Sequence, residues 1–311
     1  MIGLTLKQLR YFEALARHRH FGRAAEDCAI SQPALSLQIK ELEAMFGTAL
    51  VERGPREVRL TPMGERLLTK ARHILLEVEE LDDLVRAGKG PLAGRLRLGV
   101  IPTVAPYFLP SVIAALSHRL PELELNLREA VTQSLIADLT EGRIDLAIVA
   151  LPISEPSLTE FALFKEDFVL VRQLADAGKP VPSPAKLQTM RLLLLEEGHC
   201  FRDQALSYCE FGDARPGAFM EGSSLSTLVQ MVGAGIGVTL IPEMAVEMET
   251  RSADVSIARF PDPGPSRSIG MVWRKTNPLS DQLLQIAAII RASGTGAPGP
   301  AGDRATTVAL T

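Results

Sequence analysis

The chain has few cysteines and no long apolar segment. Only three of its 311 residues are cysteine, and no run of eighteen apolar residues occurs. The missing apolar run predicts that no segment spans a membrane. The first ten residues, MIGLTLKQLR, lack the continuous apolar core of a secretory signal. We therefore expect a cytoplasmic protein, in which a disulfide would be regulatory and not structural.

Charge is distributed unevenly along the chain. Residues 1–73 contain 12 Lys and Arg against 8 Asp and Glu, a net charge of +4, while the whole chain carries −4. The remainder must therefore carry −8. The length predicts two or more domains, and a basic head on an acidic body suggests that the head binds nucleic acid. Alternatively, the charge of +4 in residues 1–73 could belong to an ordinary solvated surface that binds no nucleic acid.

Residues 198–209, GHCFRDQALSYC, contain two of the three cysteines. The segment between them has no Gly or Pro and predicts a short helix over residues 201–208. Cys200 would stand near the start of this helix, after His199 and close to Arg202, and this environment favours a thiolate. A thiolate that attacks a peroxide becomes a sulfenic acid, which condenses with a second thiol to form a disulfide. Cys200 would be the attacked residue and Cys209 the resolving one.

The spacing of these cysteines predicts a conformational switch. A helix between them would hold their Cα atoms roughly 13 Å apart, whereas a disulfide needs about 4.4–6.8 Å. Closing the disulfide would therefore unwind the helix. The alternative is that both are ordinary packed cysteines, since free cysteine is among the most buried residue types. We expect the third, Cys28, to be a packed small residue.

Residues 5–46 show three helical patterns, over about 5–18, 22–28 and 31–46. Two short helices joined by a tight connection are typical of a helix-turn-helix, whose second helix enters the major groove. A Gly-Pro turn between short apolar strands follows and predicts a basic wing. A small helical domain with surface arginines is the alternative. The residues expected at DNA are Ser31 (also an N-cap), Gln32, Pro33, Ser36, Lys40, Arg53 and Arg56.

A heptad pattern follows, with apolar residues spaced alternately by four and three positions. These residues are Leu67, Ala71, Ile74, Val78, Leu81 and Val85. The spacing predicts a long helix that pairs with the same helix of a second copy. A helix packed only on its own domain would show a wider apolar stripe. Glycines and a proline at positions 88–94 end the helix and indicate a hinge.

Strands and helices alternate from about residue 92 to residue 293, which predicts parallel sheets with helices on both faces. We expect strands at 95–100, 122–129, 145–151, 168–172, 191–197, 218–222, 236–242 and 268–274. Besides the helix between the cysteines, we expect helices at 102–118, 132–141, 223–233 and 280–292. Residues 294–311 are rich in Gly, Ala, Pro and Thr, and we expect them to be disordered.

The run FGRAAEDCAISQPALSLQIKELEAMFGTALVER, followed by LTPMGE, resembles the winged helix-turn-helix of LysR-type transcriptional regulators. The segment GHCFRDQALSYC closely resembles the cysteine segment of the peroxide-sensing members of that family. The resemblance implies an α/β regulator with a DNA-binding domain at 1–62 and a linker helix and hinge at 63–91. It further implies a two-lobed, periplasmic-binding-protein-like regulatory domain at 92–293. Lobe I would comprise about 92–164 and 269–293, and lobe II about 165–268.

The same resemblance implies roles for residues outside the cysteine segment. Thr103 in IPTVAPY and Thr132 in REAVTQS, each at a strand-to-helix junction, would hydrogen-bond peroxide. Arg267 would stabilise the thiolate, and Asp203 would relay a proton or hydrogen-bond the site. Other interpretations stay open: the threonines as simple N-caps, Arg267 as a surface residue, and Asp203 as a first-turn carboxylate favoured by the helix dipole.

The implied function is a hydrogen-peroxide-sensing DNA-binding transcriptional regulator, and not an enzyme, that controls antioxidant genes without a cofactor or metal. Its implied partners are double-stranded promoter DNA, peroxide, RNA polymerase and further copies of itself in a homotetramer. One alternative is a LysR-type regulator that binds a small metabolite between the lobes. Another is a thiol peroxidase or reductase, against which the basic head and the lack of a C-x-x-C pair argue. A solute-binding transport protein would require an export signal.

Overall fold

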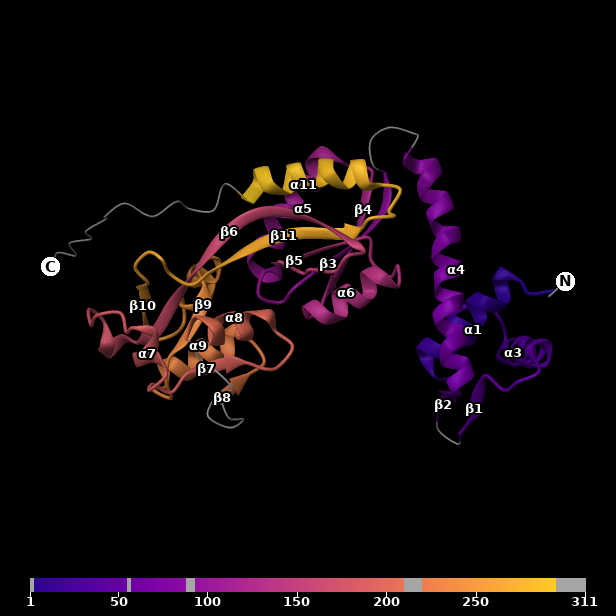
Figure 1. The fold of residues 1–311 in the computed structure, drawn as a ribbon, viewed down its shortest axis with the longest axis horizontal. Helices are drawn as coiled ribbons and strands as arrows, with labels where there is room; N and C mark the ends of the chain where they lie inside the picture. Colours follow the sequence, from indigo (N-terminus) through magenta and orange to yellow (C-terminus); the bar gives the residue numbers. More distant parts are fainter. Residues whose placement is uncertain (1–2, 55–56, 88–92, 210–219, 295–311) are drawn as a thin grey trace. The chain divides into compact units, whose positions relative to one another are not determined.

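The structure is a computed structural model that describes residues 3–54, 57–87, 93–209 and 220–294 (Figure 1). The chain forms two compact units, Met1–Lys89 and Gly90–Thr311. No helix in the described part of the chain is long and apolar enough to cross a bilayer.

The first unit is a small helical domain with a two-stranded wing. Its elements are α1 (Leu6–His18), α2 (Phe21–Asp27), α3 (Gln32–Phe46), β1 (Val51–Arg53), β2 (Val58–Leu60) and α4 (Pro62–Ala87). The three predicted helices and the two predicted short strands are therefore confirmed, and the structure shows that β1 and β2 pair antiparallel. Ser31 is the N-cap of α3 and accepts a hydrogen bond from the backbone N–H of Ala34. Leu35, Ile39 and Leu42 of α3 are buried, and Met45 is half-buried.

Helix α4 confirms the long helix that the heptad pattern predicts, but its apolar seam is not covered along its whole length. Leu67 packs against the core of the first unit, and Ala71 is fully buried. Further along, Ile74 is 43% exposed and Leu81 60% exposed. The side chain of Val85 lies outside the described residues, as do Gly88, Gly90 and Pro91 of the expected hinge. The first turns of α4 thus pack on their own domain, and the later turns present apolar side chains to solvent.

The second unit contains a seven-stranded mixed sheet. Its strands are β3 (Gly94–Val100), β4 (Leu123–Glu129), β5 (Leu146–Leu151), β6 (Leu158–Gln173), β9 (Thr239–Pro242), β10 (Val255–Arg259) and β11 (Ser266–Arg274). The order is β10-β6-β11-β5-β3-β4, and β9 also pairs with β6. Within this sheet only β3, β4 and β5 are parallel neighbours, so the expectation of a parallel arrangement is wrong for its other strands. In lobe II the predicted strands at 191–197 and 218–222 do pair in parallel, as β7 (Leu193–Leu195) and β8 (Met220–Gly222). Strand β11 is antiparallel to both β5 and β6.

Strand β6 connects the two lobes of this unit. Residues 158–167 pair with β11 in lobe I, whereas residues 168–173 pair with β9 and β10 in lobe II. Because β11 brings the chain back from lobe II, it runs against β6 and makes the sheet mixed. The sequence predicts only residues 168–172 of β6, because the polar first half has no continuous apolar run.

Helices cover both faces of the sheet in lobe I, as predicted. Helices α5 (Ala105–Arg119) and α11 (Ser280–Gly294) lie on one face and α6 (Thr132–Thr140) on the other (Figure 1). Lobe II contains α7 (Pro184–Leu187), β7 (Leu193–Leu195), α8 (Cys200–Tyr208), β8 (Met220–Gly222), α9 (Leu225–Gly233) and α10 (Val246–Glu249). The sequence does not predict α7, α10 or β10. Gly94, expected in the hinge, is instead the first residue of β3, and residues 295–311 lie outside the described residues.

Candidate functional site

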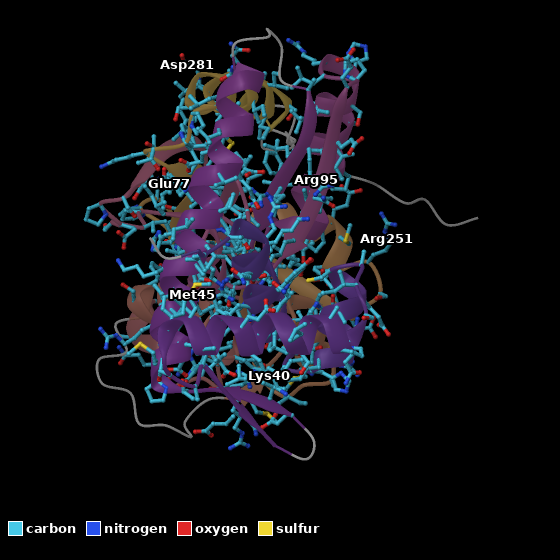
Figure 2. The ribbon with its side chains drawn as sticks, turned by 90° about the vertical axis from the view of Figure 1, so that its right-hand side faces the viewer. Lys40, Met45, Glu77, Arg95, Arg251 and Asp281 are labelled. Atoms are coloured by element: carbon cyan, nitrogen blue, oxygen red, sulfur yellow. The ribbon has the colours of Figure 1, made fainter. Side chains whose placement is uncertain are left out.

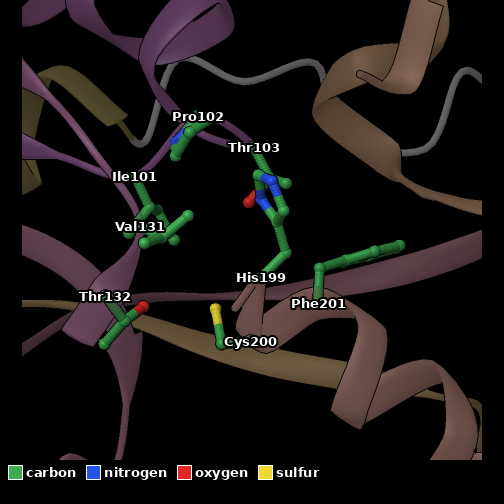
Figure 3. A pocket seen from close by; sticks show the side chains of 8 residues that line it. All are labelled: Ile101, Pro102, Thr103, Val131, Thr132, His199, Cys200 and Phe201. Atoms are coloured by element: carbon green, nitrogen blue, oxygen red, sulfur yellow. The ribbon is translucent and has the colours of Figure 1, made fainter. Parts of the chain in front are cut away.

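A small hollow lies between the two lobes of the second unit (Figure 3). Including its open mouth it encloses about 160 Å³. It is lined by Ile101, Pro102, Thr103, Val131, Thr132, His199, Cys200 and Phe201. The hollow therefore brings together four of the residues that the sequence suggests for the site, from three distant segments.

The order of strands and helices explains why these segments meet. Strands β3 and β4 are parallel neighbours, so their carboxyl ends lie at the same edge of the sheet. Thr103 follows β3, and Thr132 follows β4 as the first residue of α6. Cys200 follows β7 of lobe II as the first residue of α8. Each side chain thus stands at a strand-to-helix junction, the usual place for a ligand site in an α/β fold.

The thiol of Cys200 is half-buried and points into the hollow (Figure 3). His199 precedes it as the N-cap residue of α8, without a side-chain hydrogen bond to the helix. Burial lowers the pKa of His199 below its ordinary value, so the imidazole is neutral at pH 7. Arg202 does not assist the thiol, because its Nη1 donates to the carbonyl of Leu195 (3.0 Å) and to Glu221 (2.6 Å). The neutral imidazole can act as a proton acceptor in the hollow, where its ring points toward Thr103 (Figure 3), while the cationic neighbour expected from the sequence is engaged elsewhere.

The two threonines are not helix caps. The N-caps of α5 and α6 are Val104 and Val131, and neither helix has a side-chain cap. Thr103 is 3% exposed, and its Oγ1 accepts a 2.7 Å hydrogen bond from Nη1 of Arg267. The Oγ1 atom of Thr132 is buried without a hydrogen-bond partner among the described residues, and it points toward the Cys200 side of the hollow (Figure 3). Buried hydroxyls normally have partners, so this one keeps an unused capacity to hydrogen-bond a small polar ligand.

Arg267 is buried, so the interpretation as a surface arginine is wrong. Its Nε donates to Oε2 of Glu166 at 2.8 Å, and its Nη2 donates to the carbonyl oxygen of Thr103 at 3.0 Å. The guanidinium carbon also lies 5.5 Å from the ring centroid of Phe201, the residue after Cys200. These hydrogen bonds direct the arginine toward Thr103 and not toward the thiol. Arg267 would therefore act on Cys200 only indirectly, through Thr103 and Phe201, which line the hollow.

Asp203 is not brought into the hollow. It is exposed in the first turn of α8, where the helix dipole favours a carboxylate.

Reasoning from the sequence missed Gln204, which lies one turn after Cys200 and hence on the same helix face. Its Oε1 is buried without a partner among the described residues. The i, i+4 spacing from Cys200 is the signal that could have found it.

Cys209 lies at the opposite end of α8 as its C-cap residue. It belongs to the hydrophobic core of lobe II, and burial raises the pKa of its thiol to about 11. Both cysteines are free thiols in the structure. Helix α8, which begins at Cys200 and ends just before Cys209, confirms the predicted helix and separates the two Cα atoms by roughly 13 Å. The structure therefore represents the reduced protein.

The predicted DNA-binding residues lie mainly on one exposed helix of the first unit. Gln32, Pro33 and Lys40 are exposed on α3, and Ser36 is half-buried there. Figure 2 labels Lys40 and Met45 along this helix. Arg53 has its backbone in β1 but its side chain is not described, and Arg56 lies outside the described residues. In the described ranges, His, Cys, Asp and Glu form no cluster of three or more suited to a metal ion.

Comparison with known families matches both units of the chain. Residues 89–294 match the LysR substrate binding domain, and residues 6–65 match the bacterial regulatory helix-turn-helix protein, lysR family. The chain belongs to the LysR family. Its first unit thus carries the helix-turn-helix of a DNA-binding transcriptional regulator, and its second unit carries the family's two-lobed regulatory domain.

Several relatives and solved structures are similar over nearly the whole chain. A probable hydrogen peroxide-inducible genes activator from Streptomyces viridosporus is 46% identical over 292 residues, covering 92% of this chain and 93% of that protein. The DNA-binding transcriptional dual regulator OxyR of Escherichia coli K12 is 40% identical over 295 residues, covering 94% and 97%.

Among solved structures, a full-length cysteine-to-aspartate variant of OxyR from Pseudomonas aeruginosa has a TM-score of 0.75 at 36% identity, covering 93% of this chain and 95% of that one. A hydrogen-peroxide-bound cysteine-to-serine mutant of OxyR from Corynebacterium glutamicum has a TM-score of 0.64 at 38% identity, covering 94% and 92%. The LysR-type fold and its two-lobed regulatory domain are therefore confirmed.

Proposed function

We propose that this LysR-family regulator senses hydrogen peroxide through Cys200 and controls the transcription of antioxidant genes. The observation that carries the proposal is the hollow, in which the Cys200 thiol faces the unpartnered hydroxyl of Thr132. Peroxide is a small molecule with two oxygens that each donate and accept hydrogen bonds, which is the chemistry that an unpartnered hydroxyl beside a thiol can bind. The names of the similar proteins from Streptomyces and Escherichia coli support the same function.

The first chemical step is oxidation of Cys200. His199 accepts the thiol proton, and the thiolate sulfur attacks one peroxide oxygen. The S–O bond forms as the O–O bond breaks, and the departing hydroxide takes up the proton to become water. Thr103 and Thr132 hold the peroxide during this step, and Arg267 acts through Thr103. We assign no part in it to Asp203, which is exposed outside the hollow.

The second step is disulfide formation, and it requires a large rearrangement. The Cys209 thiol attacks the sulfur of the sulfenic acid and releases water. Because α8 separates the two residues, it must unwind before their sulfurs can meet. Unwinding removes Phe201 and Cys209 from the core of lobe II, to which both belong. Lobe II must then repack, which gives oxidation a structural consequence.

The repacked lobe would change how copies of the chain assemble on DNA. We propose that residues 1–62 bind promoter DNA, with α3 in the major groove and the wing at Arg53 and Arg56 on the backbone. Residues 63–91 join two copies through α4, whose exposed Ile74 and Leu81 continue the heptad seam. Residues 92–293 form the sensor, and pairs of dimers form a homotetramer that contacts RNA polymerase.

Mass spectrometry of the reduced protein after brief, near-stoichiometric peroxide tests the proposal. We expect a disulfide between Cys200 and Cys209 while Cys28 stays free. The Cys200→Ser variant should form no such disulfide and should lose the transcriptional response. If Cys200 and Cys209 both stayed reduced, the cysteine segment would be structural, and a metabolite in the inter-lobe hollow would become the better hypothesis.

A further inference from the structure

We propose that Glu166 is a positioning residue for the reaction with peroxide. Through Arg267 it sets the direction of the Thr103 hydroxyl in the hollow. The inference rests on the proposed function, because it concerns the same site and adds a residue that touches neither the thiol nor the hollow. Its basis is a chain of three hydrogen-bonded side chains that are buried in the second unit.

The carboxylate of Glu166 is held at both oxygens. Glu166 on β6 and Arg267 on β11 are direct cross-strand partners at the end of the lobe I pairing. Oε2 accepts the Nε–H of Arg267 at 2.8 Å, and the two side chains are 4% and 0% exposed. Oε1 accepts the backbone N–H of Met244 from lobe II at 3.2 Å. A carboxylate anchored at both oxygens keeps one orientation and imposes it on its partner.

Glu166 thereby fixes the plane of the Arg267 guanidinium. The guanidinium is planar and rigid, so a bond at Nε determines where both Nη groups point. Nη1 reaches Oγ1 of Thr103 at 2.7 Å, and Nη2 reaches the carbonyl oxygen of the same residue at 3.0 Å. The rings of Phe168 and Phe201 lie 5.9 and 5.5 Å from the guanidinium carbon and restrict its movement further.

The hydrogen bond from Arg267 determines what Thr103 can offer to a ligand. A guanidinium only donates, whereas a hydroxyl has one O–H and two lone pairs. Oγ1 of Thr103 must therefore accept from Arg267, which leaves its own O–H to point elsewhere. Because Thr103 lines the hollow beside Cys200, this O–H is available to the peroxide oxygen that leaves as hydroxide. A donor already aimed at the developing negative charge stabilises the transition state.

The test compares two reactions of Cys200 in the full-length reduced protein. Glu166→Gln keeps the size of the side chain but removes the charge that holds Nε of Arg267. We expect the second-order rate constant for oxidation of Cys200 by hydrogen peroxide to fall about tenfold, the effect of losing one well-oriented hydrogen bond. The rate of alkylation by iodoacetamide, and its dependence on pH, should stay within about twofold of wild type, because alkylation needs no peroxide oxygen to be stabilised.

Glu160→Gln is the matched control. Glu160 lies on the same strand, but its carboxylate accepts from the backbone N–H groups of Ile153 and Ser154 on an exposed loop. This variant should oxidise at the wild-type rate. If Glu166→Gln does not fold, Glu166→Asp replaces it. Aspartate keeps the negative charge, but its side chain is one methylene shorter, so the carboxylate is displaced from Nε of Arg267. The rates of oxidation and of alkylation are measured in the same way.

A double-mutant cycle tests whether Glu166 acts through Thr103. Thr103→Val removes the hydroxyl, so adding Glu166→Gln should slow the reaction with peroxide no further. Additive effects would overturn the inference, as would equal losses in oxidation and alkylation. If wild-type Cys200 oxidises no faster than Cys28 in the same sample, the proposed function fails and this inference fails with it. A fast wild type with an equally fast Glu166→Gln overturns the inference alone.

Discussion

Oγ1 of Thr103 lies 2.7 Å from Nη1 of Arg267, 164 positions further along the chain. Arg267 belongs to β11, the strand that returns from lobe II, whereas Thr103 lies in the turn after β3 of lobe I. The wall of the hollow is therefore held by a residue from the connection between the lobes. The hollow is thus connected to lobe II through β11 as well as through α8.

The unpartnered hydroxyl of Thr132 gives the first prediction. Thr132→Val should leave the free energy of unfolding within about 1 kcal/mol of wild type, since no hydrogen bond within the described protein is lost. The rate of Cys200 oxidation by peroxide should nevertheless fall. Thr140→Val on the same helix is the control, because the Thr140 hydroxyl donates to the carbonyl of Ile136 on the exposed surface. Urea unfolding and quenched-flow alkylation measure the two quantities; an unchanged oxidation rate would exclude a role for Thr132.

Tyr107 and Glu249 form a second polar junction between the lobes. The Tyr107 hydroxyl on α5 donates to Oε1 of Glu249 at 2.6 Å, while Ser226 donates to Oε2 at 2.5 Å. Tyr107→Phe would leave a buried carboxylate with one donor fewer, so we expect a loss of about 1–3 kcal/mol in the free energy of unfolding. Tyr208→Phe, which keeps the ring contact with Phe260, should change it by less than about 0.5 kcal/mol. Equal stabilities of the two variants in urea would show that this junction contributes little.

Burial of Cys209 predicts a pH-dependent stability in the reduced protein. The pKa of its thiol rises from 9.0 to about 11 on folding, because burial favours the neutral form. The unfolded chain thus ionises first as the pH increases. The stability that the folded protein gains from keeping this thiol neutral is complete below pH 9 and is lost as the pH rises to about 11.

The Cys209→Ala variant isolates this contribution. The difference in unfolding free energy between wild type and variant should shrink by about 2 kcal/mol from about pH 8 to pH 11. Urea titrations with a reductant present measure it. A difference that stayed constant over this range would show that Cys209 ionises equally in both states.

The exposed seam of α4 predicts self-association. Leu81→Glu places a charge at a position that is 60% exposed in the single chain and that a partner helix would cover. We expect a smaller assembly in sedimentation velocity with unchanged helix content. Glu77→Gln, at a polar position of the same helix labelled in Figure 2, should leave the assembly intact. If Leu81→Glu sedimented like wild type, this part of α4 would not be an interface.

Local patterns in the sequence determined the elements of the fold and the segments of the site. The cap at Ser31, the heptads of α4 and the helix after Cys200 each depend on spacings within a few turns. Helix propensity, capping and amphipathicity act over these short distances. The two strand-to-helix junctions at Thr103 and Thr132 could be predicted for the same reason.

Only the tertiary structure decided which side chains meet at the hollow. Glu166 faces Arg267 because two strands pair in one register, and no spacing along the chain predicts that register. Arg202 and Asp203 are near Cys200 in sequence, yet one binds Glu221 and the other is exposed, since α8 turns them away from the hollow. Hydrogen bonds form over about 3 Å. Contacts of that length depend on how distant segments pack, and so does the burial that sets the pKa of Cys209.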